Sequence, residues 1–267
     1  MKFDTPSVGY RVCWQPPALR TSHAIGLRLP AILLLALIFP WILTGCGSSG
    51  SSGGGYSDRA PSDRVAYTAW QEWTKFGRST VVYGGQANGY VNRSGVTERS
   101  EPLSSKIGDY WGSCGHPDWN GRTSGKPWSG AFVAWTMAHS GISATEFPRD
   151  GRHGGYLAAL YDRQQKGARL AFALHAPNEY SPKPGDLVCT GTAGPTWRNA
   201  DSRTARRRID STASHCDIVT DVRGGYLHAV GGNVKNSVTM SLYPVDSRGR
   251  LVPFAGKTWF MVVEKRV

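Results

Sequence analysis

Apolar residues in the first half of the chain recur at helical spacing. The spacing in residues 62–76 predicts an amphipathic helix with Ser62 as its N-cap and Gly77 after its end. Residues 130–140 are apolar at almost every position, which predicts a helix buried on all sides. Residues 155–166 predict a third helix. The apolar stripe of the first helix consists of Val65, Ala66, Ala69, Trp70, Trp73 and Phe76.

Beyond residue 185 the pattern changes to short β-branched runs separated by turn residues, which is typical of strands. Helices followed by such runs predict an α+β fold, with N-terminal helices packed on an antiparallel β-sheet. Residues 84–95 are rich in Gly and Asn and predict a loop or a short hairpin. The expected strands are residues 186–190, 217–222, 226–230, 237–242 and 259–263.

The polar residues 191–214 lie between two of these expected strands and contain five arginines. Their composition favours a solvated loop with no element of its own. The alternative is an anion-binding lip beside a functional site, since the segment leads directly into His215.

The start of the chain has the pattern of an export signal. Basic residues precede an uncharged apolar run at residues 29–43, and small residues follow it up to Cys46. The run is shorter than the roughly 20 apolar residues of a transmembrane helix, which favours a cleaved signal over a permanent span. Leu-Thr-Gly-Cys at residues 43–46 is similar to the lipobox of bacterial lipoproteins, and this resemblance implies lipidation of Cys46.

Three parts follow from these patterns. We expect residues 1–45 to be a signal peptide with a lipobox, residues 46–60 a lipid-anchored Gly/Ser tether, and residues 61–267 one α+β domain. Gly47 follows the anchor, which resembles the outer-membrane signal of lipoproteins in Gram-negative bacteria. The expected location is therefore the cell envelope, with a lipid anchor in the outer membrane and the domain facing the periplasm.

Charge narrows the expected partners. The chain carries 31 basic and 19 acidic residues, a net charge of +12. Residues 1–45 hold four basic residues and one acidic residue, so 27 basic and 18 acidic residues remain, a net charge of +9. A basic surface suits polyanions. Export then favours peptidoglycan or another anionic envelope polymer over nucleic acid.

The remaining cysteines and the histidines indicate no cofactor. Cys114, Cys189 and Cys216 fall in the expected domain, and two arrangements stay open: one disulfide with one free thiol, or three buried thiols. The histidines are scattered, and neither an HExxH motif nor paired CxxC motifs occur, so we expect no metal site.

Candidate chemistry begins at Ser129, next to the buried second helix. A helix N-terminus offers unpaired backbone N–H groups to an oxyanion, although serine is also a common N-cap with no catalytic role. His215 begins one expected strand and Asn233 ends the next, which predicts a nucleophile, a base and an orienting group in chain order.

Three further residues compete for these roles. Tyr110 is a candidate for the oxyanion hole, and His153, in Gly-Arg-His-Gly-Gly-Tyr, is a rival base. Asp217 is a rival for orienting His215. We favour Asn233 over it, because neighbouring positions of a strand face opposite sides.

Several motifs resemble a known superfamily. Residues 127–135, Pro-Trp-Ser-Gly-Ala-Phe-Val-Ala-Trp, are similar to the nucleophile helix of the CHAP and NlpC-type amidases, which are papain-like bacterial cell-wall enzymes. Residues 184–188 resemble their first-strand motif, and residues 215–219 resemble their histidine strand. From residue 62 to 263, including residues 110–111 and 231–234, the chain resembles an uncharacterised bacterial domain family of the same superfamily.

The resemblance implies a papain-like fold and a specific departure from its chemistry. The amidases carry cysteine where this chain has Ser129, whereas the uncharacterised family carries serine there. Serine needs a base to remove its proton during attack, unlike a thiolate. Two functions are therefore expected: a hydrolase of amide or ester bonds in cell-wall peptides that uses Ser129, His215 and Asn233, or an inactive cell-wall or protein-binding module that keeps the cleft.

Overall fold

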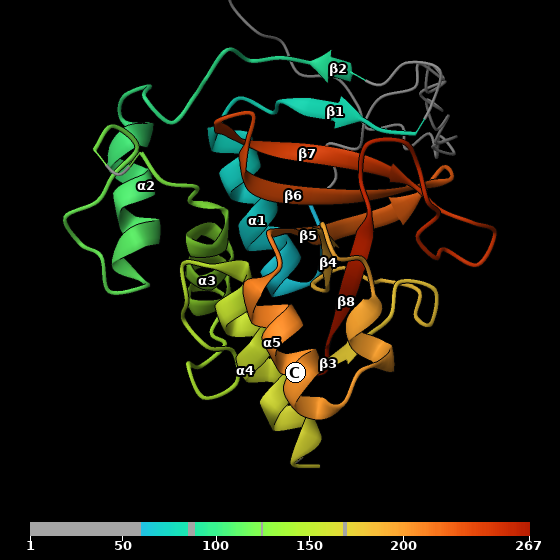
Figure 1. The fold of residues 1–267 in the computed structure, drawn as a ribbon. Helices are drawn as coiled ribbons and strands as arrows, with labels where there is room; N and C mark the ends of the chain where they lie inside the picture. The colour runs from blue at the N-terminus through green and yellow to red at the C-terminus, as the bar shows by residue number, and fades with distance from the viewer. Residues whose placement is uncertain (1–59, 85–88, 124, 168–169) are drawn as a thin grey trace, which may run out of the picture. The chain divides into compact units, whose positions relative to one another are not determined.

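The computed structural model describes residues 60–84, 89–123, 125–167 and 170–267. The expected signal peptide, Cys46 and nearly all of the expected tether lie outside the described residues. In the described part, five α-helices and one eight-stranded sheet form a mixed α+β fold (Figure 1). No helix of this part is both long enough and apolar enough to cross a membrane.

Most helices lie in the first half of the described chain and most strands in the second half. The helices are α1 (Arg64–Lys75), α2 (Leu103–Gly112), α3 (Ser129–His139), α4 (His153–Gln165) and α5 (Ser202–Ser211), with a 3-10 helix η1 (Thr196–Asn199) before α5. The strands are β1 (Thr80–Val82), β2 (Gly89–Asn92), β3 (Phe172–His175), β4 (Leu187–Gly191), β5 (Ser214–Arg223), β6 (Tyr226–Val234), β7 (Ser237–Pro244) and β8 (Trp259–Lys265).

The sheet has the strand order β2-β1-β7-β6-β5-β4-β8-β3. Strands β4 to β7 are consecutive antiparallel neighbours, so the expected meander is confirmed there. Strand β1 pairs with β7 in parallel, which makes the sheet mixed. The five expected strands correspond to β4–β8. Strand β2 lies within residues 84–95 and pairs antiparallel with β1, in line with the short hairpin expected there, whereas β3, at the other edge of the sheet, was not predicted.

Two of the expected helices begin differently from the prediction. Asp63, not Ser62, caps α1, since its carboxylate accepts hydrogen bonds from the N–H groups of Val65 and Ala66 at 2.9 and 3.0 Å. Helix α4 begins at His153, two residues earlier than expected. The expected buried helix is confirmed as α3, which is buried from Ser129 to Met137 because α1, α2, β5 and β6 all contact it.

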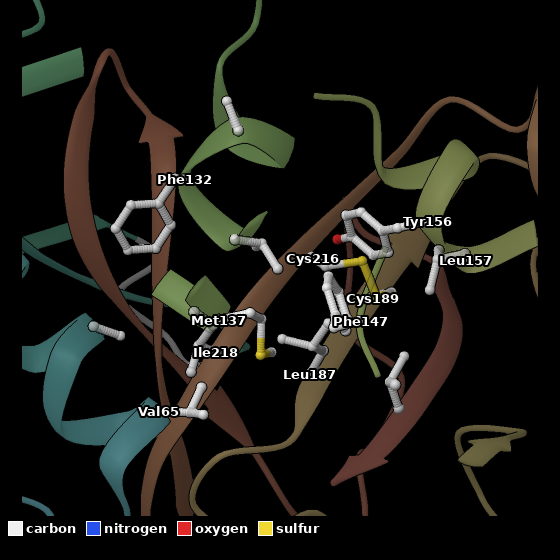
Figure 2. Packing of buried hydrophobic residues seen from close by; sticks show 14 of the residues in the cluster. Val65, Phe132, Met137, Phe147, Tyr156, Leu157, Leu187, Cys189, Cys216 and Ile218 are labelled. Atoms are coloured by element: carbon white, nitrogen blue, oxygen red, sulfur yellow. A yellow bond between two sulfur atoms is a disulfide. The ribbon is translucent and has the colours of Figure 1, made fainter. Parts of the chain in front are cut away.

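The sheet carries an apolar core on each face, because successive strand residues point to opposite sides. Figure 2 shows the helix-facing core, in which Ile218 and Leu187 of the sheet lie among Phe132, Met137 and Tyr156 of the helices. The other face has a smaller aromatic and aliphatic cluster, closed partly by side chains from the segment that joins β7 to β8. That cluster contains Val188, Val219, Leu227, Ala229, Tyr243, Leu251, Trp259 and Val262.

Cys189 of β4 and Cys216 of β5 form a disulfide, and Cys114 is a half-buried free thiol. The two bridged residues lie directly opposite each other in the strand register. Both are fully buried in the helix-facing core (Figure 2). Of the two arrangements left open by the sequence, one disulfide with one free thiol is therefore the one observed.

The expected loop at residues 191–214 is wrong in its central part, where η1 and α5 form. Asp201 caps α5 by accepting a hydrogen bond from the Thr204 N–H at 3.0 Å. Ala205 and Ile209, four positions apart, bury one face of the helix in the protein. Two apolar residues and a cap therefore suffice to fold a segment that is otherwise polar and rich in arginine.

The disulfide predicts a measurable loss of stability. Its sequence separation is 27 residues, and closing a loop of that size stabilises a fold by about 3 kcal/mol. We expect the double variant Cys189→Ala/Cys216→Ala to lose about that much free energy of unfolding in urea titrations. Cys114→Ala is the matched control and should change far less. Equal losses in both variants would contradict the assignment of the bridge.

Candidate functional site

Ser129 is the first residue of α3, and its side chain does not cap the helix. Trp128 occupies the N-cap position, with no side-chain cap hydrogen bond. The Ser129 hydroxyl instead lies 2.7 Å from Nε2 of His153, the first residue of α4. Both residues are nearly buried, with 6% and 5% of their surfaces exposed. The capping explanation for Ser129 is therefore not what the structure shows.

Glycines bring the ends of α3, α4 and α5 together around this contact. A Cβ on Gly130 would lie 2.3 Å from the carbonyl oxygen of Gly151. A Cβ on Gly154 would lie 2.4 Å from the carbonyl oxygen of Asp210, at the end of α5. Real Cβ contacts are not this short, so a larger residue at either position forces the backbones apart. The glycines that flank Ser129 and His153 in the sequence are thus required by this close packing.

His153 uses both ring nitrogens. Its Nδ1 lies 2.5 Å from the hydroxyl of Tyr156, one turn further along α4. Burial and, to a smaller extent, the nearby His215 lower the pKa of His153 to about 3, although the charge of Asp217 opposes the shift. The ring is therefore neutral at ordinary pH and has one donating and one accepting nitrogen. In the tautomer that carries its proton on Nδ1, this nitrogen donates to Tyr156 and Nε2 accepts from the Ser129 hydroxyl.

A second polar chain begins at His215. Its Nε2 lies 2.7 Å from Oδ1 of Asp217, and Oδ2 of the same carboxylate accepts a hydrogen bond from Tyr243 at 2.6 Å. The ammonium group of Lys257 donates to the Tyr243 hydroxyl at 2.9 Å. A Cβ on Gly231 would lie 1.8 Å from Oδ1, so only glycine leaves room for this carboxylate.

Asp217 is only 1% exposed, yet it is held ionised. Burial alone would raise the pKa of its carboxyl, but the charge and hydrogen bond of His215, together with Lys257 and Tyr243, outweigh burial and lower it. A buried carboxylate is costly unless it is paired in this way. The protein therefore maintains a negative charge close to the two histidines.

The two polar groups are neighbours. The rings of His153 and His215 have their centroids 5.4 Å apart, in an edge-on arrangement. Ser129 from α3, His153 from α4 and the His215–Asp217 pair from β5 thus form one cluster contributed by three elements. The sequence identified every member of this cluster as a candidate, but assigned the partners differently.

Two expected roles have a different outcome. His215 contacts Asp217 and not Asn233. His215 and Asp217 are two positions apart in β5, so they share a face of the strand, whereas the expectation had treated them as neighbouring positions on opposite faces. Asn233 has a left-handed backbone, φ 59°, at the irregular end of β6. The hydroxyl of Tyr110, the oxyanion candidate, donates to buried Glu72 at 2.5 Å, which places it in the packing of α2 against α1.

Ser129 and His153 lie on the wall of a cavity of about 620 Å³. One part of its wall is aromatic, where His116 stacks on Trp119 with ring centroids 4.0 Å apart. The other lining residues are mostly polar and include both charge signs. They are Trp111, Lys126, Pro127, Asp150, Gly151, Arg152, Gly154, Asp210, Ser211, Thr212, Ala213 and Ser214. Within the described ranges, no three His, Cys, Asp or Glu residues are arranged to hold a metal ion.

Comparison with known protein families shows which family the chain belongs to. A family model described as an uncharacterized protein conserved in bacteria (DUF2272) matches residues 97–264. The match covers more than half of the chain, so the chain belongs to this bacterial family. No curated protein and no solved structure matches it. The matched range contains Ser129, His153, His215 and Asp217.

The glycine packing predicts a specific sensitivity. Gly130→Ala should lower the free energy of unfolding by about 1–3 kcal/mol, because the new methyl group collides with the Gly151 carbonyl. Gly112→Ala, at the end of α2, is the matched control, since a Cβ there meets nothing within 4 Å. Thermal or urea unfolding of both variants measures the difference. Similar stabilities would show that α3 and the segment before α4 are not packed as described.

Burial of neutral His153 predicts how stability depends on pH. Below pH about 6.5 the unfolded chain binds a proton on this residue, while the folded chain, with a pKa of about 3, does not. The stability that the fold gains from burying neutral His153 is fully present above pH 6.5 and is lost as pH falls toward 3. His153→Gln should therefore flatten the fall in unfolding free energy between pH 6.5 and 4 by up to about 1.4 kcal/mol per pH unit. Parallel curves for wild type and variant would refute this.

Proposed function

We propose that this chain is an envelope lipoprotein whose α+β domain hydrolyses amide or ester bonds in cell-wall peptides, with Ser129 as the nucleophile. The observation that supports this most is the 2.7 Å contact between the Ser129 hydroxyl and His153 on the wall of the cavity. A hydroxyl paired with a neutral imidazole at a helix N-terminus is one arrangement that activates a nucleophile and supplies donors to its oxyanion.

The chemistry follows from the positions of the groups. Nε2 of His153 takes the hydroxyl proton as the Ser129 oxygen attacks the carbonyl carbon, and Nδ1 stays bonded to Tyr156. The backbone N–H groups of the first turn of α3 have no partners within the helix and can stabilise the oxyanion. The proton on His153 then passes to the leaving group, and water releases the acyl group from Ser129 by the same steps.

His215 and Asp217 act on His153 through space in this proposal. The negative charge of Asp217 favours the imidazolium that forms on His153, whereas a proton on His215 disfavours it. The expected set of Ser129, His215 and Asn233 is thus revised to Ser129 and His153, with His215 and Asp217 as an adjoining pair that adjusts the base.

A papain-like relationship is part of the proposal. In the CHAP and NlpC-type amidases that the sequence resembles, a nucleophile helix is followed by an antiparallel sheet with a histidine strand. Here α3 contacts β5 and β6, and β5 carries His215, which agrees with that order. Ser129 replaces the cysteine of those enzymes.

The disulfide supports the proposed location. Buried disulfides persist in oxidising compartments and are rare in the cytosol. The bridge between Cys189 and Cys216 therefore agrees with the export pattern of residues 1–45 and with a lipid anchor on Cys46 in the outer membrane. Peptidoglycan is then the nearest large substrate for a domain on a short tether.

The second candidate is a binding module that holds a cell-wall peptide or a partner protein without turnover. One observation favours it: a pKa of about 3 makes His153 a weak base, and the Ser129–His153–Tyr156 hydrogen bonds then serve to rigidify the cavity wall.

A serine-reactive fluorophosphonate probe separates the two candidates. Labelling of the purified full chain should occur at Ser129 and vanish in Ser129→Ala, and His153→Gln should slow it about 100-fold by removing the base. Ser140→Ala, at the other end of the same helix, is the matched control and should label normally. A folded wild-type chain that is never labelled would favour the binding module. Amidase activity gained by Ser129→Cys would show that the cleft accepts the substrate.

A further inference from the structure

Two arginines of helix α5 lie in a row that starts at the edge of the cavity. Arg203, Arg207 and Asp210 occupy positions i, i+4 and i+7, so they share one face of the helix. Asp210 lines the cavity that contains Ser129. At a rise of about 1.5 Å per residue, Arg207 lies roughly 5 Å and Arg203 roughly 10 Å from Asp210 along the helix axis. The row therefore runs from the cavity edge outward.

The two arginines of this row have unused hydrogen-bonding capacity. Both are exposed, and neither forms an ion pair or a side-chain hydrogen bond with any residue in the described part of the chain. The adjacent acidic groups already have partners: Asp162 binds Arg206 at 2.8 Å, and Asp210 binds Arg152 at 3.3 Å. Arg203 and Arg207 are thus not neutralised by these carboxylates, whereas at the cavity edge Asp210 and Arg152 are paired with each other.

The features of α5 favour a peptide over a membrane surface as the ligand. Membrane-surface helices insert an apolar face, but the apolar residues of α5, Ala205 and Ile209, are buried inside the protein. A guanidinium group pairs with a carboxylate through two parallel hydrogen bonds. Arg203 and Arg207 are about 6 Å apart along the axis. Alternate side chains of an extended peptide are about 6.6 Å apart, so acidic residues at every second position match this spacing.

We propose that Arg203 and Arg207 bind the carboxylates of an extended acidic peptide whose end enters the Ser129 cavity. Arg152, at the cavity wall, is already paired with Asp150 at 3.8 Å and Asp210 at 3.3 Å, so Arg203 and Arg207 carry the proposed binding. This assignment names the substrate class of the proposed hydrolase and rests on that function for turnover, but the binding itself does not require turnover.

Fluorescence anisotropy at low salt tests the binding in the full chain carrying Ser129→Ala, which removes the hydroxyl and any turnover. The probe is fluorescein-labelled Ala-Glu-Ala-Glu-Ala-Glu, and its glutamine counterpart is the neutral reference. We expect the glutamate probe to bind more tightly. Arg203→Gln/Arg207→Gln should weaken it about three- to tenfold, the range expected for two exposed charge pairs. The matched control Arg93→Gln/Arg99→Gln removes two exposed arginines elsewhere and should leave the affinity unchanged.

A cavity-filling variant tests whether the end of the peptide enters the cavity. Ala213→Trp fills the cavity from an exposed position on its wall and should weaken the glutamate probe without changing the charge of α5. Ser211→Trp replaces it if that variant does not fold. Unchanged affinity in a folded cavity-filling variant would overturn entry of the peptide end.

Two other outcomes would overturn the peptide assignment. One is equal loss of affinity in the α5 variant and the arginine control, which indicates attraction by total charge only. The other is tighter binding to phosphatidylglycerol vesicles than to the peptide, lost in the α5 variant, which indicates a lipid ligand. Because the assay uses Ser129→Ala, either result is independent of whether Ser129 is a nucleophile.

Discussion

The burial of α3 is the constraint on which the rest of the site depends. A helix that is apolar on all sides must be enclosed, and its first turn then presents N–H groups and a hydroxyl to protein rather than to bulk water. At its N-terminus, α3 lies against the segment before α4, a close approach that Gly130 permits, and Gly154 permits a similar approach of α4 to the end of α5. The Ser129–His153 contact is therefore a direct result of how the helix is buried, and it forms wherever this packing forms.

The packing around strand β6 also depends on glycines that leave room for neighbouring groups. Gly231 and Gly232 are adjacent in β6 and face opposite sides of the sheet. Gly231 leaves room for the Asp217 carboxylate, while a Cβ on Gly232 would lie 2.5 Å from Cβ of Phe132 in α3. One pair of glycines thus leaves room for a buried charge on one face of the sheet and for α3 on the other, so the positions of Asp217 and Ser129 depend on the same stretch of β6.

Much of this fold was predictable from the sequence, for identifiable reasons. Helices α1 and α3 and strands β4–β8 have strong apolar patterns. In contrast, β1 and β3 have only three and four residues, and β2 is exposed at the sheet edge, so periodicity carries little information there. Helix α5 was missed because only two of its residues are apolar. Ser129, His153, His215 and Asp217 were all named, and the spacing of two between His215 and Asp217 in one strand already places them on one face. The contact between Ser129 and His153 joins two helices, and no spacing along the chain predicts it.

The disulfide affects the stage of maturation at which the site is fully held in place. It joins β4 to the strand that carries His215 and Asp217, one residue on either side of Cys216. Before oxidation, only the hydrogen bonds of the sheet and side-chain packing hold that strand at this point. A chain surrounded by reducing thiols would therefore hold its His215–Asp217 pair more loosely than the same chain after oxidation, and the maturation of the site would follow the compartment that the protein has reached.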